Sequence, residues 1–193
     1  RGAGELLGEE QSGQIQEVGF SLYTELLERA VRALREGRIP ELDADARRHT
    51  EVELHLPALI PDDYLGDVHT RLMLYKRIAS APDDEGLDRL TEEMVDRFGV
   101  LPPQTANLFQ VARLRLRAAA LGIRKLELGA LGGRVLFFPN PPVDALVVIR
   151  MVQKLPKVYA LDGPDKLKVR LELPGAAERL RTAGDILRVL GGR

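Results

Sequence analysis

DDEGLDRLTEEMVDRFG, residues 83–99, combines a helical apolar stripe with a strong excess of carboxylates. Its apolar side chains recur at the three- and four-residue spacing of one helix face: Leu87, Leu90, Met94 and Phe98, widened by Thr91 and Val95. Asp83 and the acids after it lie where the helix dipole favours carboxylates, and Gly99 is placed to end the helix. We therefore predict a helix that packs this stripe into a core.

The rest of this helix surface is acidic. The acids on the far side of the stripe or on its flank are Glu85, Glu92, Glu93 and Asp96, and the basic residues of the segment are Arg89 and Arg97. Most acidic faces of this kind are simply solvated. A docking surface for a basic partner is the other interpretation, because complementary charge steers association and gives specificity. Patterning alone favours the solvated face.

Composition restricts the function classes. The 193 residues contain 28 Lys and Arg against 29 Asp and Glu, a net charge of -1 that gives no general attraction to nucleic acid or anionic membranes. The chain has no cysteine, which excludes disulfides, thiolate nucleophiles and zinc-thiolate sites and fits a reducing cytoplasm. No apolar run approaches the roughly 20 residues that span a bilayer. We expect a cytoplasmic protein without a membrane partner, and the glycine-rich start at Arg1 predicts a piece of a longer chain.

Three segments are expected along the chain. Residues 1–19 have no sustained period and predict a loop, and residues 20–50 predict a connecting helix, to about Arg35, followed by a polar linker. Residues 51–193 predict one α+β domain, with helices packed around a small, mainly antiparallel sheet and the helical arm in front of it.

Within residues 51–193 the elements follow from periodicity and turn residues. Period-two alternation predicts a strand over 51–56, and glycine- or proline-containing turns predict two hairpins, 123–128 with 134–138 and 158–161 with 167–173. Helices are predicted over 67–79, 103–121, 144–154 and 176–190. The residues expected to be buried are, in the same order of helices, Val68, Leu72, Tyr75 and Ile78 in the first; Leu108, Val111, Leu114, Ala118 and Leu121 in the second; Leu146, Ile149 and Val152 in the third; and Leu180, Ile186, Leu187 and Leu190 in the fourth.

Motifs for catalysis and metal binding do not stand out. His49, His55 and His69 have no second histidine or carboxylate at a recognised metal spacing, so we predict no metal site. No nucleophile elbow, Ser/His/Asp order or paired active-site carboxylates are evident, so we predict no catalytic residues. A hydrolase with an unrecognised site stays open as an alternative.

Two basic stretches raise the alternative of DNA contact. The first contains Arg113, Arg115, Arg117, Arg124 and Lys125, and the second Lys154, Lys157, Lys166, Lys168 and Arg170. On the predicted helix Arg115 points about 200° away from Arg113, which breaks any single phosphate-tracking stripe. Aromatic residues that stack bases are also not interleaved with these cations. DNA contact by this domain is therefore the second interpretation.

Long phrases of the chain resemble one protein family. RGAGELLGEEQSGQIQEVGFSLYTELLERAV, residues 1–31, resembles the end of a translocation motif found in bacterial transcription-repair coupling factor and a related branch-migrating helicase. VELHLPALIPDDYLGDVHTRLMLYKRIASA, VDRFGVLPP, ARLRLRAAALGIRKLE and KVYALDGPDKLKVR resemble successive blocks of the coupling factor's C-terminal domain. The resemblance covers essentially the whole chain and is looser after Leu128.

The resemblance implies a large ATP-dependent DNA translocase that removes stalled RNA polymerase from damaged duplex DNA and recruits nucleotide excision repair. The motor that binds ATP and Mg would lie outside this chain, which is then expected to be non-catalytic and to need no cofactor. Arg1 matches the family's motif arginine that couples ATP hydrolysis to movement, and Gln11 and Gly13 fall in the same loop.

A docking role also follows from the resemblance. The family's C-terminal domain is implied to fold back on an N-terminal module that resembles the excision nuclease's damage-recognition subunit, masking the surface that recruits the partner ATPase of that pathway. Glu93 and Asp96 match the family carboxylates that pair with basic residues of that module, and Glu92 lies on the same helix surface. We expect Glu93 and Asp96 to point outward and not to be neutralised by guanidinium groups of their own domain.

Overall fold

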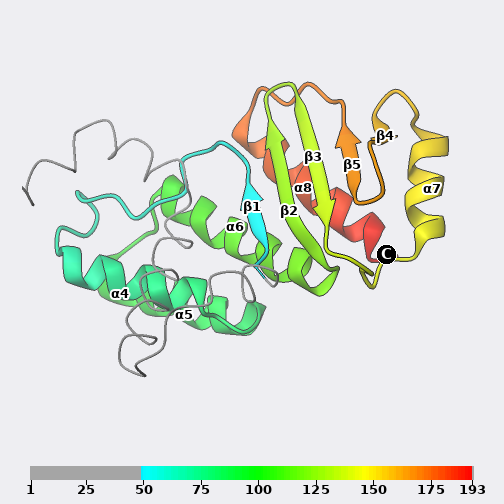
Figure 1. The fold of residues 1–193 in the computed structure, drawn as a ribbon. Helices are drawn as coiled ribbons and strands as arrows, with labels where there is room; N and C mark the ends of the chain where they lie inside the picture. Colours follow the sequence, from blue (N-terminus) through cyan, green and yellow to red (C-terminus); the bar gives the residue numbers. More distant parts are fainter. Residues whose placement is uncertain (1–48, 193) are drawn as a thin grey trace, which may run out of the picture.

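A computed structural model describes residues 49–192 (Figure 1). Its helices are α4 (Val68–Ala79), α5 (Asp84–Phe98), α6 (Pro103–Ala120), α7 (Ala145–Lys154) and α8 (Ala176–Leu190). Its strands are β1 (Glu51–Glu53), β2 (Ile123–Gly129), β3 (Gly132–Phe137), β4 (Tyr159–Leu161) and β5 (Lys166–Val169). The predictions for the loop and the arm at residues 1–48, with Arg1, Gln11 and Gly13, lie outside the described residues.

In the described part of the chain, the strands form one sheet in the order β1-β2-β3-β5-β4. β1 pairs with β2 in parallel, and the other three pairings are antiparallel. The predicted α+β class with a mainly antiparallel sheet is therefore confirmed, and so are both hairpins. The first strand is shorter than predicted, because the pairing ends at Glu53 and the chain turns at His55.

Glycine makes the first hairpin possible. Gly132 has φ +109°, a backbone conformation that residues other than glycine rarely adopt. A Cβ atom at Gly133 would overlap the carbonyl oxygen of Glu127 on the facing strand. The two strands can therefore approach closely only with glycine at these positions.

One face of the sheet is apolar and the other is charged. The buried strand residues Leu126, Val135 and Leu167 belong to the same core cluster as Leu114 of α6 and Ile186 of α8. In Figure 1, α8 crosses behind the strands. The opposite face carries charged side chains on β1, β2, β3 and β5, so helices cover one side of the sheet.

Helix α6 joins two core clusters. Leu114 and Ala118 pack into the sheet core, whereas Phe109 and Ala112 pack into a second core with α4 and α5. The prediction assigned α6 one buried side and omitted Phe109 and Ala112. It failed there because a helix packed on both sides has no single apolar stripe.

The inner faces predicted for α4 and α7 are partly wrong. Val68 and Leu72 of α4 are 58% and 43% exposed, and Leu74 is buried beside the correctly predicted Ile78. On α7, Leu146 and Ile149 are exposed, and Met151 supplies the buried contact. Both helices are short and carry apolar residues on more than one side, so packing against neighbouring elements decides which stripe is buried.

Helix α5 agrees closely with its prediction. Leu87, Leu90 and Met94 are buried, and Asp83 accepts a hydrogen bond from the Gly86 N–H at 2.7 Å as the N-cap. Gly99 follows the helix with φ +87° and donates to the Val95 carbonyl at 2.9 Å. Among the described residues, no helix has the length and apolar character needed to cross a membrane.

Candidate functional site

The flank of α5 that faces α6 is neutralised by arginines. Arg113 approaches Asp88 at 2.6 Å and Asp84 at 3.7 Å, and Arg117 approaches Asp84 at 3.3 Å. Arg113 also donates to the Asp84 backbone carbonyl. These pairs attach the N-terminal half of α5 to α6 and leave its acids little attraction for an outside cation.

The flank that faces α4 is held by Glu93. Arg77 of α4 binds both carboxylate oxygens of Glu93, at 2.8 and 2.5 Å, and Arg97 donates to Oε1 at 3.0 Å. The hydrogen bonds from Arg77, with a smaller contribution from Arg97, lower the pKa of Glu93 from its ordinary value of 4.5 to about 2, against the opposing effect of burial. Glu93 is therefore a structural carboxylate that joins two helices.

This arrangement corrects one expectation. Glu93 was expected to be free of guanidinium partners within its own domain, and it has two. Periodicity within a single segment cannot show that α4 and α5 bring Arg77 beside Glu93. The docking role of Glu93 itself stays a prediction.

Glu92 and Asp96 differ from their neighbours. Both are exposed and neither forms an ion pair with any described residue. They lie four residues apart on one helix face, where two like charges destabilise a helix by about 0.2–0.5 kcal/mol. We call these two residues the acidic ridge. Val95, 40% exposed, lies between them in sequence.

The helix end beside the ridge is fixed in place. The Tyr64 hydroxyl donates to the Gly99 carbonyl at 3.0 Å, and its ring meets that of Phe98 edge-on at 6.4 Å between centroids. Arg97 lies 4.9 Å above the Phe98 ring, within the range of a cation–π interaction. With Met94 fully buried beneath, the ridge carboxylates project from a rigid support.

The first basic stretch is used inside the domain. Besides the Arg113 and Arg117 pairs, Arg115 donates to the Ala79 carbonyl, Arg124 lies 3.9 Å from Asp165, and Lys125 binds Glu53 at 2.7 Å. These cations serve packing between elements, which leaves the DNA-contact interpretation without support from this stretch.

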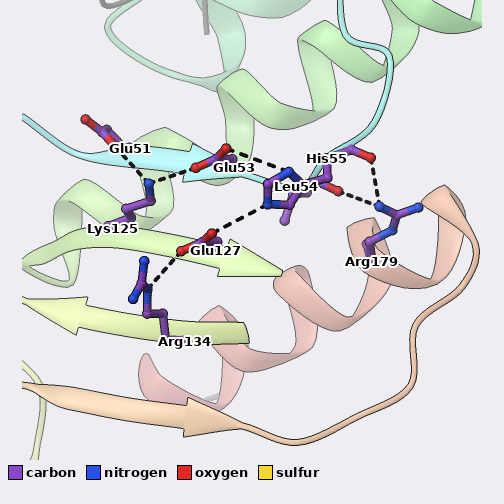
Figure 2. Close-up of polar contacts among 8 residues, drawn as sticks. All are labelled: Glu51, Glu53, Leu54, His55, Lys125, Glu127, Arg134 and Arg179. Atoms are coloured by element: carbon purple, nitrogen blue, oxygen red, sulfur yellow. Dashed lines mark hydrogen bonds and ion pairs between the residues drawn. The ribbon is translucent and has the colours of Figure 1, made fainter. Parts of the chain in front are cut away.

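A group that the sequence did not reveal lies at the charged face of the sheet (Figure 2). Donor atoms of Glu53, His55 and Glu127 lie within 4.8 Å of one another. The prediction assigned His55 no metal-ligand partners because Glu127 is remote in sequence. Pairing of β1 with β2 brings it close, since Glu53 is the register partner of Glu127.

Comparisons with known proteins agree on one family. The model of the TRCF domain matches residues 54–147. The chain is 48% identical over 190 residues to the transcription-repair-coupling factors of Haemophilus influenzae and of Escherichia coli K12, which covers 98% of this chain and 17% of each relative. The chain therefore spans about a sixth of the length of these relatives.

A solved structure shares the fold. The crystal structure of the C-terminal domain of a transcription-repair coupling factor superposes with a TM-score of 0.61 at 18% identity, over 75% of this chain and 96% of that domain. At this identity the likeness concerns the fold alone.

Proposed function

The chain belongs to the transcription-repair-coupling factor family, and from that premise we propose that it is a non-catalytic regulatory domain of an ATP-dependent DNA translocase. In this proposal it docks through α5 on the N-terminal module of the same polypeptide and masks the surface that recruits nucleotide excision repair. The ATP and Mg of the motor, duplex DNA, RNA polymerase and the excision-repair ATPase are partners of the whole protein rather than of this domain.

One observation carries the proposal. Along α5, Asp84, Glu85, Asp88 and Glu93 each have an arginine within 4 Å, whereas Glu92 and Asp96 have no cation partner among the described residues. Packing and pairing satisfy the rest of the helix, so the two open carboxylates remain available to arginine or lysine on another surface.

The energetics suit a reversible contact. An exposed ion pair contributes about 0–1 kcal/mol, so a ridge of two carboxylates contributes a small part of any docking free energy. A modest rearrangement in the motor could then release the domain. The exposed side chain of Val95 adds apolar area beside the charges, which gives the contact a component that salt does not screen.

The roles of the carboxylates differ in this proposal. Asp96 and Glu92 pair directly with the partner module. Glu93 keeps α4 against α5 through Arg77, and it would reach the partner only by sharing its carboxylate with an incoming cation. The family-based assignment of Glu93 as a docking residue thus becomes a supporting one.

Titration of this chain with the separately expressed N-terminal module tests the proposal. The double variant Glu92→Gln/Asp96→Asn should bind about tenfold more weakly at low salt, the loss expected from two exposed pairs. Wild-type affinity should also fall several-fold between low and physiological ionic strength.

The matched control is Glu85→Gln, an exposed α5 acid that already pairs with Arg89 at 2.7 Å. It should bind like the wild type. Equal affinity of the double variant and the wild type, or a retarded duplex DNA band with the isolated chain at physiological salt, would contradict docking as the main role of this domain.

A further inference from the structure

The charged face of the sheet holds a compact group of metal-ligating side chains, on different elements from the acidic ridge. The Nε2 atom of His55 lies 3.5 Å from Oε1 of Glu127, and Nδ1 lies 3.7 Å from Oε1 of Glu53. These separations exceed the 2.7–3.2 Å of ordinary hydrogen bonds. The imidazole therefore stands between two carboxylate oxygens without being bonded to either (Figure 2).

Both carboxylates are oriented from behind by a cation. Lys125 binds Oε2 of Glu53 at 2.7 Å, and Arg134 donates to Oε2 of Glu127 at 2.8 Å. In each case the second oxygen, Oε1, is the one directed toward His55. Ligating carboxylates in metal sites are commonly held in this way by hydrogen bonds from outer residues.

The position of His55 is also imposed by the fold. Its φ of +48° is uncommon for a residue other than glycine, and Arg179 of α8 donates to the carbonyls of Leu54 at 3.1 Å and His55 at 2.7 Å (Figure 2). The guanidinium thereby fixes the backbone turn that swings the imidazole over β2. The side chain, 45% exposed, keeps the freedom to rotate.

We propose that Glu53, His55 and Glu127 form a binding site for a divalent transition-metal ion, with Zn²⁺ as the preferred ion. One imidazole nitrogen and one oxygen of each carboxylate would be the protein ligands, and water would complete the shell. Zinc bonds of about 2.0–2.1 Å place tetrahedral ligands about 3.4 Å apart. The donors, all within 4.8 Å of one another, already lie near that spacing.

Charge and donor type select the ion. Glu51, Glu53 and Glu127 outnumber Lys125 and Arg134 by one negative charge, so a cation is accommodated. The imidazole donor favours zinc over magnesium or calcium, which prefer oxygen ligands throughout.

The bound ion would cross-link the edge strand β1 to β2. β1 is a three-residue edge strand, and its only strand neighbour in the described sheet is β2. A metal held by Glu53 and His55 on one side and by Glu127 on the other would tie this strand to the sheet. The site would therefore stabilise the start of the domain, independently of docking through α5.

Zinc titration of the whole 193-residue chain, followed by calorimetry and thermal unfolding, tests the site. Saturating Zn²⁺ at about a hundredfold excess over its Kd should raise the Tm by about 5–10 °C. His55→Gly removes the ligand while accepting the positive φ, and Glu127→Gln keeps the side-chain shape. Both variants should stay folded and lose most of the zinc-dependent shift.

His69→Ala is the control, since it removes another exposed histidine of the same domain, on α4, and should keep the shift. The proposal is overturned if His55→Gly binds zinc as well as the wild type. It is also overturned if magnesium produces the same shift as zinc, because the imidazole would then have no part in binding.

Discussion

The carboxylates on the two flanks of α5 and those on its outward ridge differ in whether the domain itself neutralises them. On the flanks, Asp88 meets Arg113 and Glu93 meets Arg77, and each pair joins α5 to a neighbouring helix. On the ridge, Glu92 and Asp96 have no such partner among the described residues and repel each other weakly. The difference indicates that charge on the flanks contributes to folding, whereas charge on the ridge stays unpaired within the described part of the chain.

The largest expected loss of stability comes from truncating the core side chain that lies beneath both the flanks and the ridge. Met94→Ala deletes a side chain with no exposed surface in the core formed by α4, α5 and α6. Such truncations cost about 2–5 kcal/mol. Urea unfolding should show this loss, and a cost below 1 kcal/mol would mean that the ridge does not rest on a packed core.

A flank carboxylate should affect stability by less. Glu93→Gln removes the acceptor charge for Arg77 and Arg97, and we expect a loss of about 1 kcal/mol in unfolding free energy. Glu93 and Arg77 remain 32% and 44% exposed, so solvent screening keeps the contribution well below the value implied by the pKa shift. Thermal unfolding at pH 7 provides the measurement, and Glu85→Gln, at an exposed pair within α5, should lose less.

The Glu93–Arg77 pair should also make the stability of the domain depend on pH within a defined range. Because the folded-state pKa of Glu93 is about 2, below its ordinary 4.5, its contribution is present above pH 4.5 and is lost as the pH falls toward 2. The stability difference between the wild type and Glu93→Gln should therefore shrink across this range. A difference that stays constant from pH 7 to pH 2 would show that the carboxylate charge is not its cause.

The smallest expected change in stability comes from a ridge residue, and it is a gain rather than a loss. Glu92→Gln relieves the repulsion with Asp96 and should raise the unfolding free energy by about 0.2–0.5 kcal/mol. Chemical denaturation of both proteins at low salt measures it. A clear loss of stability would show that Glu92 has a partner within the domain, and the contrast between flank and ridge would then fail.

Local rules predicted much of the fold. The helix at 84–98, its Asp83 and Gly99 boundaries and both hairpins follow from periodicity, capping and turn residues, which act over a few positions. Local rules did not predict the buried faces of α4 and α7, because each helix carries more than one apolar stripe. The second buried side of α6 also escaped prediction, since it depends on the placement of α4 and α5.

The candidate site was likewise predictable only in part. That α5 carries an acidic outer surface was evident from its own residues. The capture of Glu93 by Arg77, sixteen positions earlier, and the approach of Glu127 to His55 are tertiary events. Charge patterning within a segment therefore shows where acids gather, and only the packed structure shows which of them remain unpaired.

The central claim is that the ridge binds and the flank stabilises. Docking and unfolding of the single variants Asp96→Asn and Glu93→Gln, measured side by side with the N-terminal module as the ligand, test it most directly. We predict that Asp96→Asn weakens docking several-fold without any loss of stability, and that Glu93→Gln lowers stability with the smaller effect on docking. Docking that survives Asp96→Asn unchanged but is lost in Glu93→Gln would contradict the account.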